Sequence, residues 1–346
     1  SAITPFPQTL VGNDSTVISS GGAILAFPPS FVGRAFVLNG GALVATINNT
    51  ALLVGALVVA TDGVVGCFDC AVAADAQNWI PGCSGSIFNP CPPLLIKATE
   101  ITFTGSGRLR GYVVDVQSDG FISIDERCTW TTSDPTSDSK LRVQAAFFRT
   151  QGYIRFSTIQ IAGKDLYVGS SAWISTNALG FIGGRGPAAG MSDKSGGGGG
   201  GNGGDGAQGC ALAALGGHSV WNLSQNVTSP WTLGSGGGQG GGNSASGGGR
   251  GGGRLRISLT GNLTLLGALS ADGASTQCIG VTRSWYIRNR ADKPFIAGSH
   301  GGGAGAGGSI WILASFVFGD GAIYARGGSS YCTSHLAWPG GGGGGG

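Results

Sequence analysis

The chain has 346 residues, of which 70 are glycine, 41% are apolar and only 11% are charged. Its length and apolar content allow one large domain or two medium ones with a hydrophobic core. A formal net charge of +3 is too small to indicate an electrostatic partner, which argues against nucleic acid and an anionic membrane surface. A surface this poor in charge needs another source of solubility, such as glycans or burial in lateral assembly.

The N-terminal part predicts strands and almost no helix. No long segment has apolar residues at helical spacing, whereas runs rich in Val, Ile, Leu, Phe and Thr recur between Gly, Asn, Asp or Pro, as in an all-β fold. The expected strands are 35–38, 52–61, 94–103, 112–116 and 121–124. We therefore expect an N-terminal β domain with a cysteine cluster over residues 1–145, for which the pattern does not decide between a solenoid and a sandwich.

Residues 146–346 have a more regular pattern. Segments 253–273 and 308–328 both read as a glycine run, two strands, a glycine-containing turn, a third short strand and glycine again, and a weaker copy covers 152–180. Such repeats are typical of a solenoid, whose units bury their apolar faces against each other. The predicted fold class is all-β, a parallel β-helix or β-solenoid with long glycine-rich loops over residues 146–346. The alternative is an antiparallel β-sandwich with disordered glycine loops.

Five glycine runs separate these strands, at 196–201, 236–242, 247–253, 301–308 and 340–346. Ordering a backbone costs about 1–2 kcal/mol per residue, which favours disorder of a free glycine run. The alternative is the threefold polyproline-II-like helix. Several such helices without side chains can pack side by side and pair their N–H and C=O groups, aided by Cα–H···O contacts. The sequence leaves both states open.

Eight cysteines and five N-x-Ser/Thr sequons indicate a secreted, N-glycosylated chain. The predicted glycan sites are Asn13, Asn48, Asn222, Asn226 and Asn262. The predicted disulfide cysteines, whose pairing the sequence does not assign, are Cys67, Cys70, Cys83, Cys91, Cys128, Cys210, Cys278 and Cys332. A start at Ser1 is what a secreted chain has after removal of a leader, and the apolar stretch 51–60 is too short to cross a bilayer.

Signals for metals and cofactors are weak. The stretch 200–208 follows the outline of a calcium nonapeptide with Asp205 as ligand, but such sites share ligands between tandem copies and this is one copy. The cluster Cys67–Cys91 could bind zinc as four thiolates, although an oxidising compartment favours disulfides. His218, His300 and His335 have no metal-ligand spacing. We therefore expect no metal and no other cofactor, with calcium at Asp205 as a weak exception.

No motif indicates an enzyme. Carbohydrate-active β-helices need carboxylates that converge on one face, but the neighbours Asp125 and Glu126, near Asp115 and Asp119, would point to opposite faces of a strand. The segment Arg250–Arg254 looks like an Arg-Gly-Gly RNA-binding segment, yet the sequons and cysteines argue against an intracellular compartment. A tryptophan side chain can cover a hydrophobic core or stack on a sugar ring. The tryptophans are Trp79, Trp130, Trp173, Trp221, Trp231, Trp285, Trp311 and Trp338, with Trp311 expected in the core.

The segment 301–328, GGGAGAGGSIWILASFVFGDGAIYARGG, resembles the repeat of large glycine-rich extracellular proteins of plants and protists. The likeness extends over about residues 150–346, whereas residues 1–145 have no counterpart in it. It implies a component of a cell surface or wall with a β-helical fold, and it carries over no catalytic residue.

These observations predict a structural, non-enzymatic subunit of an extracellular filament, surface appendage or matrix. Its partners would be further copies of itself and covalent N-glycans, without nucleic acid binding or membrane insertion. The apolar segment 3–10 is a hypothetical arm for exchange between copies. The alternative is an adhesin or carbohydrate-binding module of the cell surface that uses the loop tryptophans.

Overall fold

The computed structural model describes residues 16–19, 24–26, 33–37, 40–45, 51–67, 94–132, 139–193, 196–209, 214–219, 230–240, 247–278, 301–332 and 341–346. The chain forms two compact units. The first comprises residues 1–175, 256–269 and 312–323, and the second comprises 176–255, 270–311 and 324–346. The predicted domain boundary after residue 145 falls inside β11 (Lys140–Thr150) of the first unit.

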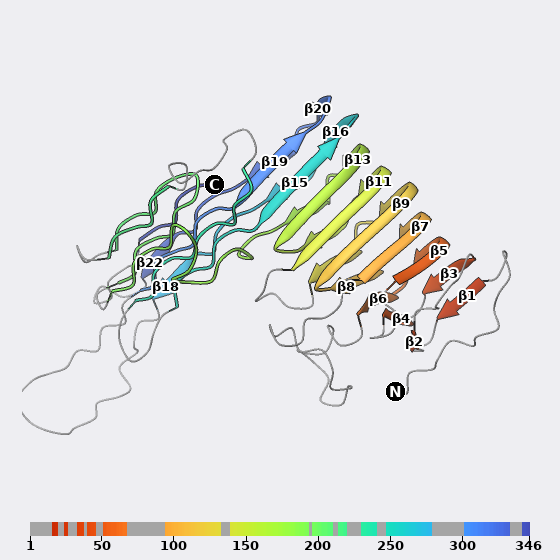
Figure 1. Ribbon diagram of the computed structural model, residues 1–346, viewed down its shortest axis with the longest axis horizontal. Coiled ribbons are helices and arrows are strands. Elements are labelled where there is room, and N and C mark those ends of the chain that lie inside the picture. Colours follow the sequence, from red (N-terminus) through yellow and green to blue (C-terminus); the bar gives the residue numbers. More distant parts are fainter. Residues whose placement is uncertain are drawn as a thin grey trace, which may run out of the picture. The chain divides into compact units, whose positions relative to one another are not determined.

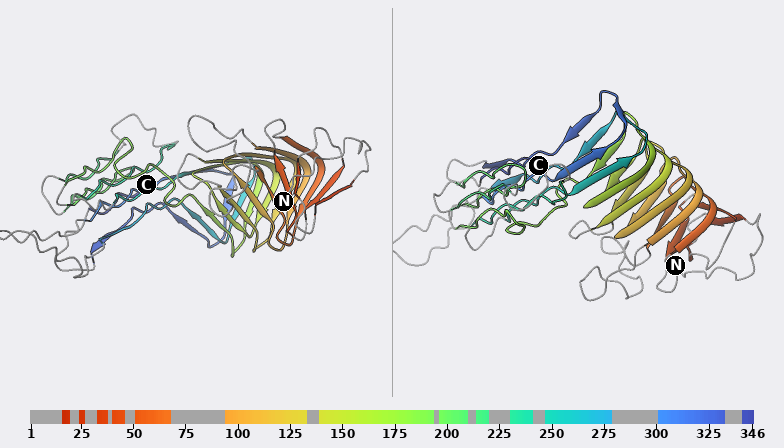
Figure 2. Two further views of the ribbon diagram at one scale, coloured as in Figure 1. Left: turned by 90° about the horizontal axis from the view of Figure 1, so that it is seen from below. Right: turned by 45° about the horizontal axis from the view of Figure 1, so that its top comes forward.

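Two sheets, of 11 and 9 strands, form the framework of the first unit (Figures 1 and 2). The larger follows the order β1-β3-β5-β7-β9-β11-β13-β15-β19, and β16 pairs with β13 and β20. Its strands are β1 (Thr16–Ser19), β3 (Arg34–Val37), β5 (Ala51–Val59), β7 (Leu94–Phe103), β9 (Val113–Ile124), β11, β13 (Thr158–Val168), β15 (Arg254–Leu259), β16 (Asn262–Leu265), β19 (Ser309–Leu313) and β20 (Phe316–Phe318).

The smaller sheet follows the order β2-β4-β6-β8-β10-β12-β14-β17-β21. Its strands are β2 (Ile24–Ala26), β4 (Ala42–Ala45), β6 (Val64–Cys67), β8 (Arg108–Gly111), β10 (Thr129–Thr132), β12 (Tyr153–Arg155), β14 (Trp173–Ser175), β17 (Ala268–Ser270) and β21 (Ala322–Tyr324). Up to β15, therefore, the chain passes alternately through the two sheets. A separate pair consists of β18 (Thr276–Cys278) and β22 (Ser330–Cys332).

The period-two pattern of the sequence decides which face of each strand is buried. In β11, Leu141, Val143 and Ala145 are buried, whereas Lys140 and Arg142 between them are exposed. Successive side chains of a strand point to opposite faces, so alternation of this kind leaves one face apolar. This face packs into the core, and its burial provides the main driving force for folding.

Aromatic rings join the two sheets across the core. Trp130 of β10 is fully buried and lies edge-on to Phe103 of β7, with ring centroids 5.1 Å apart. Its other neighbour is Phe148 of β11, at 6.1 Å. Because β10 belongs to the smaller sheet and β7 and β11 to the larger, the core of the first unit lies between the sheets.

The predicted fold class requires correction. The sequence predicts a parallel β-helix or β-solenoid with long glycine-rich loops over residues 146–346, but the long strands are β5, β7, β9, β11 and β13, the first of which begins at residue 51. The described residues form two parallel sheets without a helix, and the glycine runs are not loops that leave a coil. The antiparallel sandwich is wrong as well, because the described strand pairs are parallel. Glycine runs look like loops in a sequence because they carry no side-chain pattern, yet their backbone groups pair.

In the second unit, hydrogen bonds join the glycine runs with a period of three. Successive N–H groups of residues 303–308 donate to three neighbouring segments in turn, with N···O distances of 2.6–3.0 Å. Residues 303 and 306 donate to 238 and 235, residues 304 and 307 to 341 and 344, and residues 305 and 308 to 274 and 271. A threefold helix points every third residue in the same direction. The described residues of the glycine runs thus form a packed bundle of threefold segments, in which 301–308 are buried.

Close packing of the bundle depends on the absence of side chains. A Cβ atom on Gly199 would overlap the carbonyl oxygen of Gly342, and one on Gly305 would overlap that of Arg250. In contrast, a Cβ on Gly345 would find its nearest neighbour, the carbonyl oxygen of Ala325, at 3.9 Å. Glycine is therefore a steric requirement inside the bundle and not at every position of the runs.

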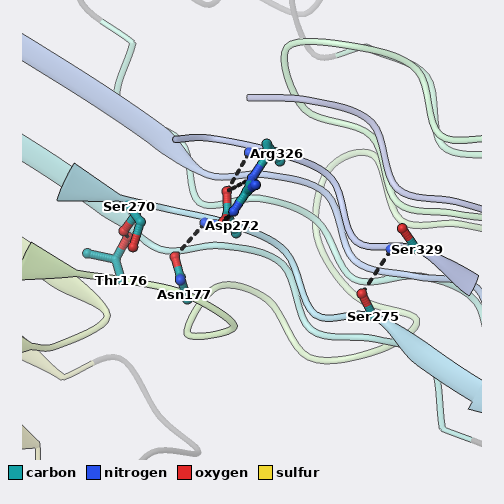
Figure 3. Close-up of polar contacts among 7 residues, drawn as sticks. All are labelled: Thr176, Asn177, Ser270, Asp272, Ser275, Arg326 and Ser329. Atoms are coloured by element: carbon teal, nitrogen blue, oxygen red, sulfur yellow. Dashed lines mark hydrogen bonds and ion pairs between the residues drawn. The ribbon is translucent and has the colours of Figure 1, made fainter. Parts of the chain in front are cut away.

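Side chains at the border of the bundle accept hydrogen bonds from neighbouring backbone segments (Figure 3). Asn177 Oδ1 accepts the N–H of Asp272 at 2.7 Å, and Asp272 Oδ1 accepts the N–H of Arg326 at 2.8 Å. The Arg326 guanidinium turns back to Asp272 Oδ2 at 2.6 Å. Ser275 Oγ accepts the N–H of Ser329 at 3.0 Å. An arginine side chain has no acceptor, so this ladder ends at Arg326.

Candidate assembly surface

The last strands of the two sheets in the first unit carry an exposed apolar surface, which we call the β20 edge. It consists of Leu313, Phe316, Val317, Phe318 and Ile323, from β19, β20 and β21. Phe316 is 63% exposed and Val317 is 56% exposed, and the rings of Phe316 and Phe318 stack at a centroid distance of 5.9 Å. Contiguous exposed apolar side chains of this size commonly mark an interaction site.

Val317 is the last member of a core column. Strand register aligns Val17 in turn with Ala35, Leu57, Ile101, Ile122, Phe148, Leu166, Leu263 and Val317. From Ala35 to Leu263 every side chain is at most 1% exposed. Val317 has the same type of side chain at the same register position, and it is exposed because no further strand of the described chain covers it.

The β20 edge also lacks the usual protection of a sheet edge. Edge strands commonly carry lysine, other charges or proline, which prevent a second chain from pairing with them. None of the strands β19, β20 and β21 contains a charged residue or a proline. The only charged residue between Ser309 and Tyr324 is Asp320, in the turn between β20 and β21. The edge is thus chemically suited to strand addition.

Of the five predicted glycan sites, the structure describes Asn262 only. Asn262 is exposed at the start of β16, and its backbone N–H donates to Asp165 Oδ1 at 2.8 Å. Its side chain is thus on the surface, as an N-glycan requires. Asn13, Asn48, Asn222 and Asn226 lie outside the described residues.

The cysteines divide into three groups. Cys128 differs from its prediction as a disulfide cysteine, because it is a buried free thiol in the turn before β10, with its Sγ 3.8 Å from the carbonyl oxygen of Gly105. The backbones of Cys278 and Cys332 lie directly opposite each other in β18 and β22, and Cys67 ends β6. The cysteines Cys70, Cys83, Cys91 and Cys210 lie outside the described residues. Disulfides at the cysteines other than Cys128 stay predictions.

The four acidic residues do not converge on one groove, although two of them share a depression. Asp125 and Glu126 lie in the turn after β9 and, with Arg127, line an open depression. Asp115, on β9, contacts Arg142 at 4.0 Å and accepts a hydrogen bond from Gln117. The expectation that Asp125 and Glu126 point to opposite faces of a strand is thus wrong, because both lie in a turn and line the same depression, whereas Asp115 is held separately on β9.

Residues that the sequence weighed as metal or RNA ligands have local roles in the second unit. Asp205 Oδ1 accepts the backbone N–H of Ser219. Arg250 donates to the carbonyl oxygen of Gly180 at 3.3 Å, and Arg254 lies 4.3 Å above the ring of Trp231. Within the described ranges, no three His, Cys, Asp or Glu side chains come together as a metal site. His300 and His335 lie outside these ranges.

The tryptophans occupy different environments. Trp130 is core, and Trp311, which we expected in the core, is half-buried on β19. Trp173 of β14 is exposed and lies edge-on to Tyr153 of the neighbouring β12, with ring centroids 5.8 Å apart. Of the expected loop tryptophans, Trp231 lies beneath Arg254, and Trp221, Trp285 and Trp338 lie outside the described residues, as does Trp79. Sequence reasoning missed the β20 edge, although its lack of charge is visible in the sequence.

Comparisons with known proteins found no matching protein family, no similar curated protein and no similar solved structure. In the part of the chain that the structure describes, no helix is long and apolar enough to span a membrane.

Proposed function

We propose that the protein is a structural subunit that assembles with further copies of itself into a filament, surface appendage or matrix outside the cell. The observation that carries this proposal is the β20 edge, where a buried core column ends in the exposed Val317. Edges of this kind are templates for pairing with another chain. A packed glycine bundle, in which backbone groups pair with backbone groups, suits a load-carrying scaffold.

The extracellular setting rests on the sequons and cysteines, and on the resemblance to glycine-rich extracellular proteins of plants and protists. The exposed side chain of Asn262 supports glycosylation at that sequon. Calcium is not part of the proposal, since within the described ranges no group of three His, Cys, Asp or Glu side chains forms around Asp205. An enzymatic role is not part of it either.

A second candidate function is carbohydrate binding by the exposed Trp173 and the half-buried Tyr153 beside it. Indole and phenol rings offer an apolar face and a polar edge, which suits sugar rings. A glycan array separates the two proposals. Saturable binding to one class of glycan that Trp173→Ala removes would favour the binding module, whereas a scaffold is expected to bind none selectively.

Electron microscopy of the purified, glycosylated protein at physiological salt tests the structural proposal. We expect unbranched fibres of uniform width that lengthen with protein concentration. Single particles with the mass of one chain at every concentration would contradict it.

A further inference from the structure

We propose that β1 of a second copy of this chain adds in parallel to β20 of the first, so that the larger sheet continues from copy to copy. This inference rests on the proposed structural function and names the two surfaces that join the copies. It commits to a second copy as the occupant of the β20 edge.

Strand register provides the first argument. Val17 of β1 and Val317 of β20 are the first and last positions of the same column, in which the seven intervening side chains are apolar and buried. Addition of β1 to β20 places Val17 of one copy beside Val317 of the other. The column then continues across the junction at the spacing that it already has between strands, about 4.8 Å.

The two sheets provide the second argument. The larger sheet begins with β1 and reaches β20 through β16, and the smaller begins with β2 and ends with β21. Ile323 of β21 is 49% exposed, so the smaller sheet also ends in an uncovered apolar residue. One displacement of a second copy along the stacking direction therefore brings β1 to β20 and β2 to β21 together.

Strand direction decides between a chain of copies and a closed dimer. The described pairs within both sheets are parallel, and β1 and β20 point the same way along one sheet. A displacement without a twofold rotation keeps this direction and leaves a new β20 edge free, which gives an open, head-to-tail assembly. A twofold contact between two β20 strands would be antiparallel, would misalign the column and would end at a dimer.

Hydrogen exchange followed by mass spectrometry tests the two surfaces directly. Below and above the assembly concentration, we expect peptides that contain residues 16–19 and 316–318 to gain protection together. Peptides from β9 and β11 serve as internal controls, because these strands are already paired on both sides and should exchange equally slowly in both samples.

The matched variants are Val317→Asp and Val317→Ile. Val317 is exposed, so neither change should alter the folding of the single chain. The carboxylate would lie unpaired inside the junction, which is costly, so Val317→Asp should raise the concentration needed for assembly by more than about ten-fold. Val317→Ile keeps an apolar, β-branched side chain and should assemble like the unchanged protein.

Three results would overturn the inference, and they differ in whether the proposed structural function fails as well. Assembly of Val317→Asp at the unchanged concentration, with protection away from 16–19 and 316–318, would place the junction elsewhere and leave the structural function standing. Protection of 316–318 alone in a closed dimer would assign the β20 edge to a twofold contact. A wild-type chain that stays single at every concentration would contradict the structural function and the junction together.

Discussion

Single glycines in the bundle differ in what they tolerate, and this difference tests whether the runs are packed. Gly199→Ala would push a methyl group into the carbonyl oxygen of Gly342. Overpacking of this kind costs about 1–3 kcal/mol. Gly345→Ala has its nearest neighbour at 3.9 Å, and at such a position alanine stabilises by about 0.4–1 kcal/mol because it restricts the unfolded chain.

Urea unfolding of the two variants, both in glycine runs, measures these opposite changes. A disordered run would respond in the same way at both positions. Equal effects on the free energy of unfolding would therefore contradict the packed bundle.

Cys128 gives the folded state a dependence on alkaline pH. Burial raises the pKa of its thiol from the ordinary value of 9.0 to about 11, and the charge of Asp125 adds to the rise. The folded protein thus holds this proton more tightly than the unfolded chain does. The resulting stabilisation is complete below pH 9 and is lost as the pH rises from about 9 to about 11.

We expect the free energy of unfolding to fall more steeply across this window in the unchanged protein than in Cys128→Ala, which has no thiol to ionise. Urea titrations of both proteins at matched pH values give the difference, in which the contributions of other titrating groups cancel. Parallel pH profiles would show that Cys128 does not titrate differently in the folded state.

At the scale of the strand, neighbouring members of one column should respond very differently to the same change. Leu263 is fully buried and Val317, its register partner on β20, is 56% exposed. Leu263→Ala should cost about 2–5 kcal/mol, whereas Val317→Ala should stay within about 0.5 kcal/mol in the single chain. Thermal unfolding at a concentration below assembly measures both. A comparable loss at Val317 would mean that this side chain is covered within one chain.

The strands themselves were largely predictable, because alternation and turn residues are local signals. The expected segments 52–61 and 94–103 correspond closely to β5 and β7. The segments 112–116 and 121–124 proved to be one strand, β9. The polar residues between them look like a turn, but Ser118 is buried and its hydroxyl donates to the carbonyl oxygen of Thr99 at 2.7 Å. The Ser118 hydroxyl thus provides a hydrogen bond to a backbone carbonyl at the point where the pairing of β7 and β9 is irregular.

The pairing of strands and the β20 edge were not predictable in the same way. The column that ends at Val317 depends on register between strands far apart in sequence, such as β13 and β16. A single strand carries its inward and outward faces but not its partners. For the glycine runs the sequence has no side-chain pattern at all, so their packing depends on which segments the rest of the fold brings together.

At the scale of the whole molecule, the described chain combines two kinds of backbone pairing. In the first unit, parallel strands pair and leave an apolar edge without charges at β19, β20 and β21. In the second, glycine segments pair with a period of three and leave no room for a side chain at positions such as Gly199 and Gly305. Parallel strand pairing can extend from one copy of the chain to the next, and we propose that it does so at the β20 edge.

X-ray fibre diffraction from aligned assemblies tests that claim most directly. If the sheets continue from copy to copy, the strands lie across the fibre, and the spacing between paired strands, about 4.8 Å, should appear as a reflection along the fibre axis. The reflection should weaken in Val317→Asp at the same protein concentration. Well-ordered fibres whose 4.8 Å reflection lies perpendicular to the axis would contradict the account, because copies would then join through other surfaces than the ends of their sheets.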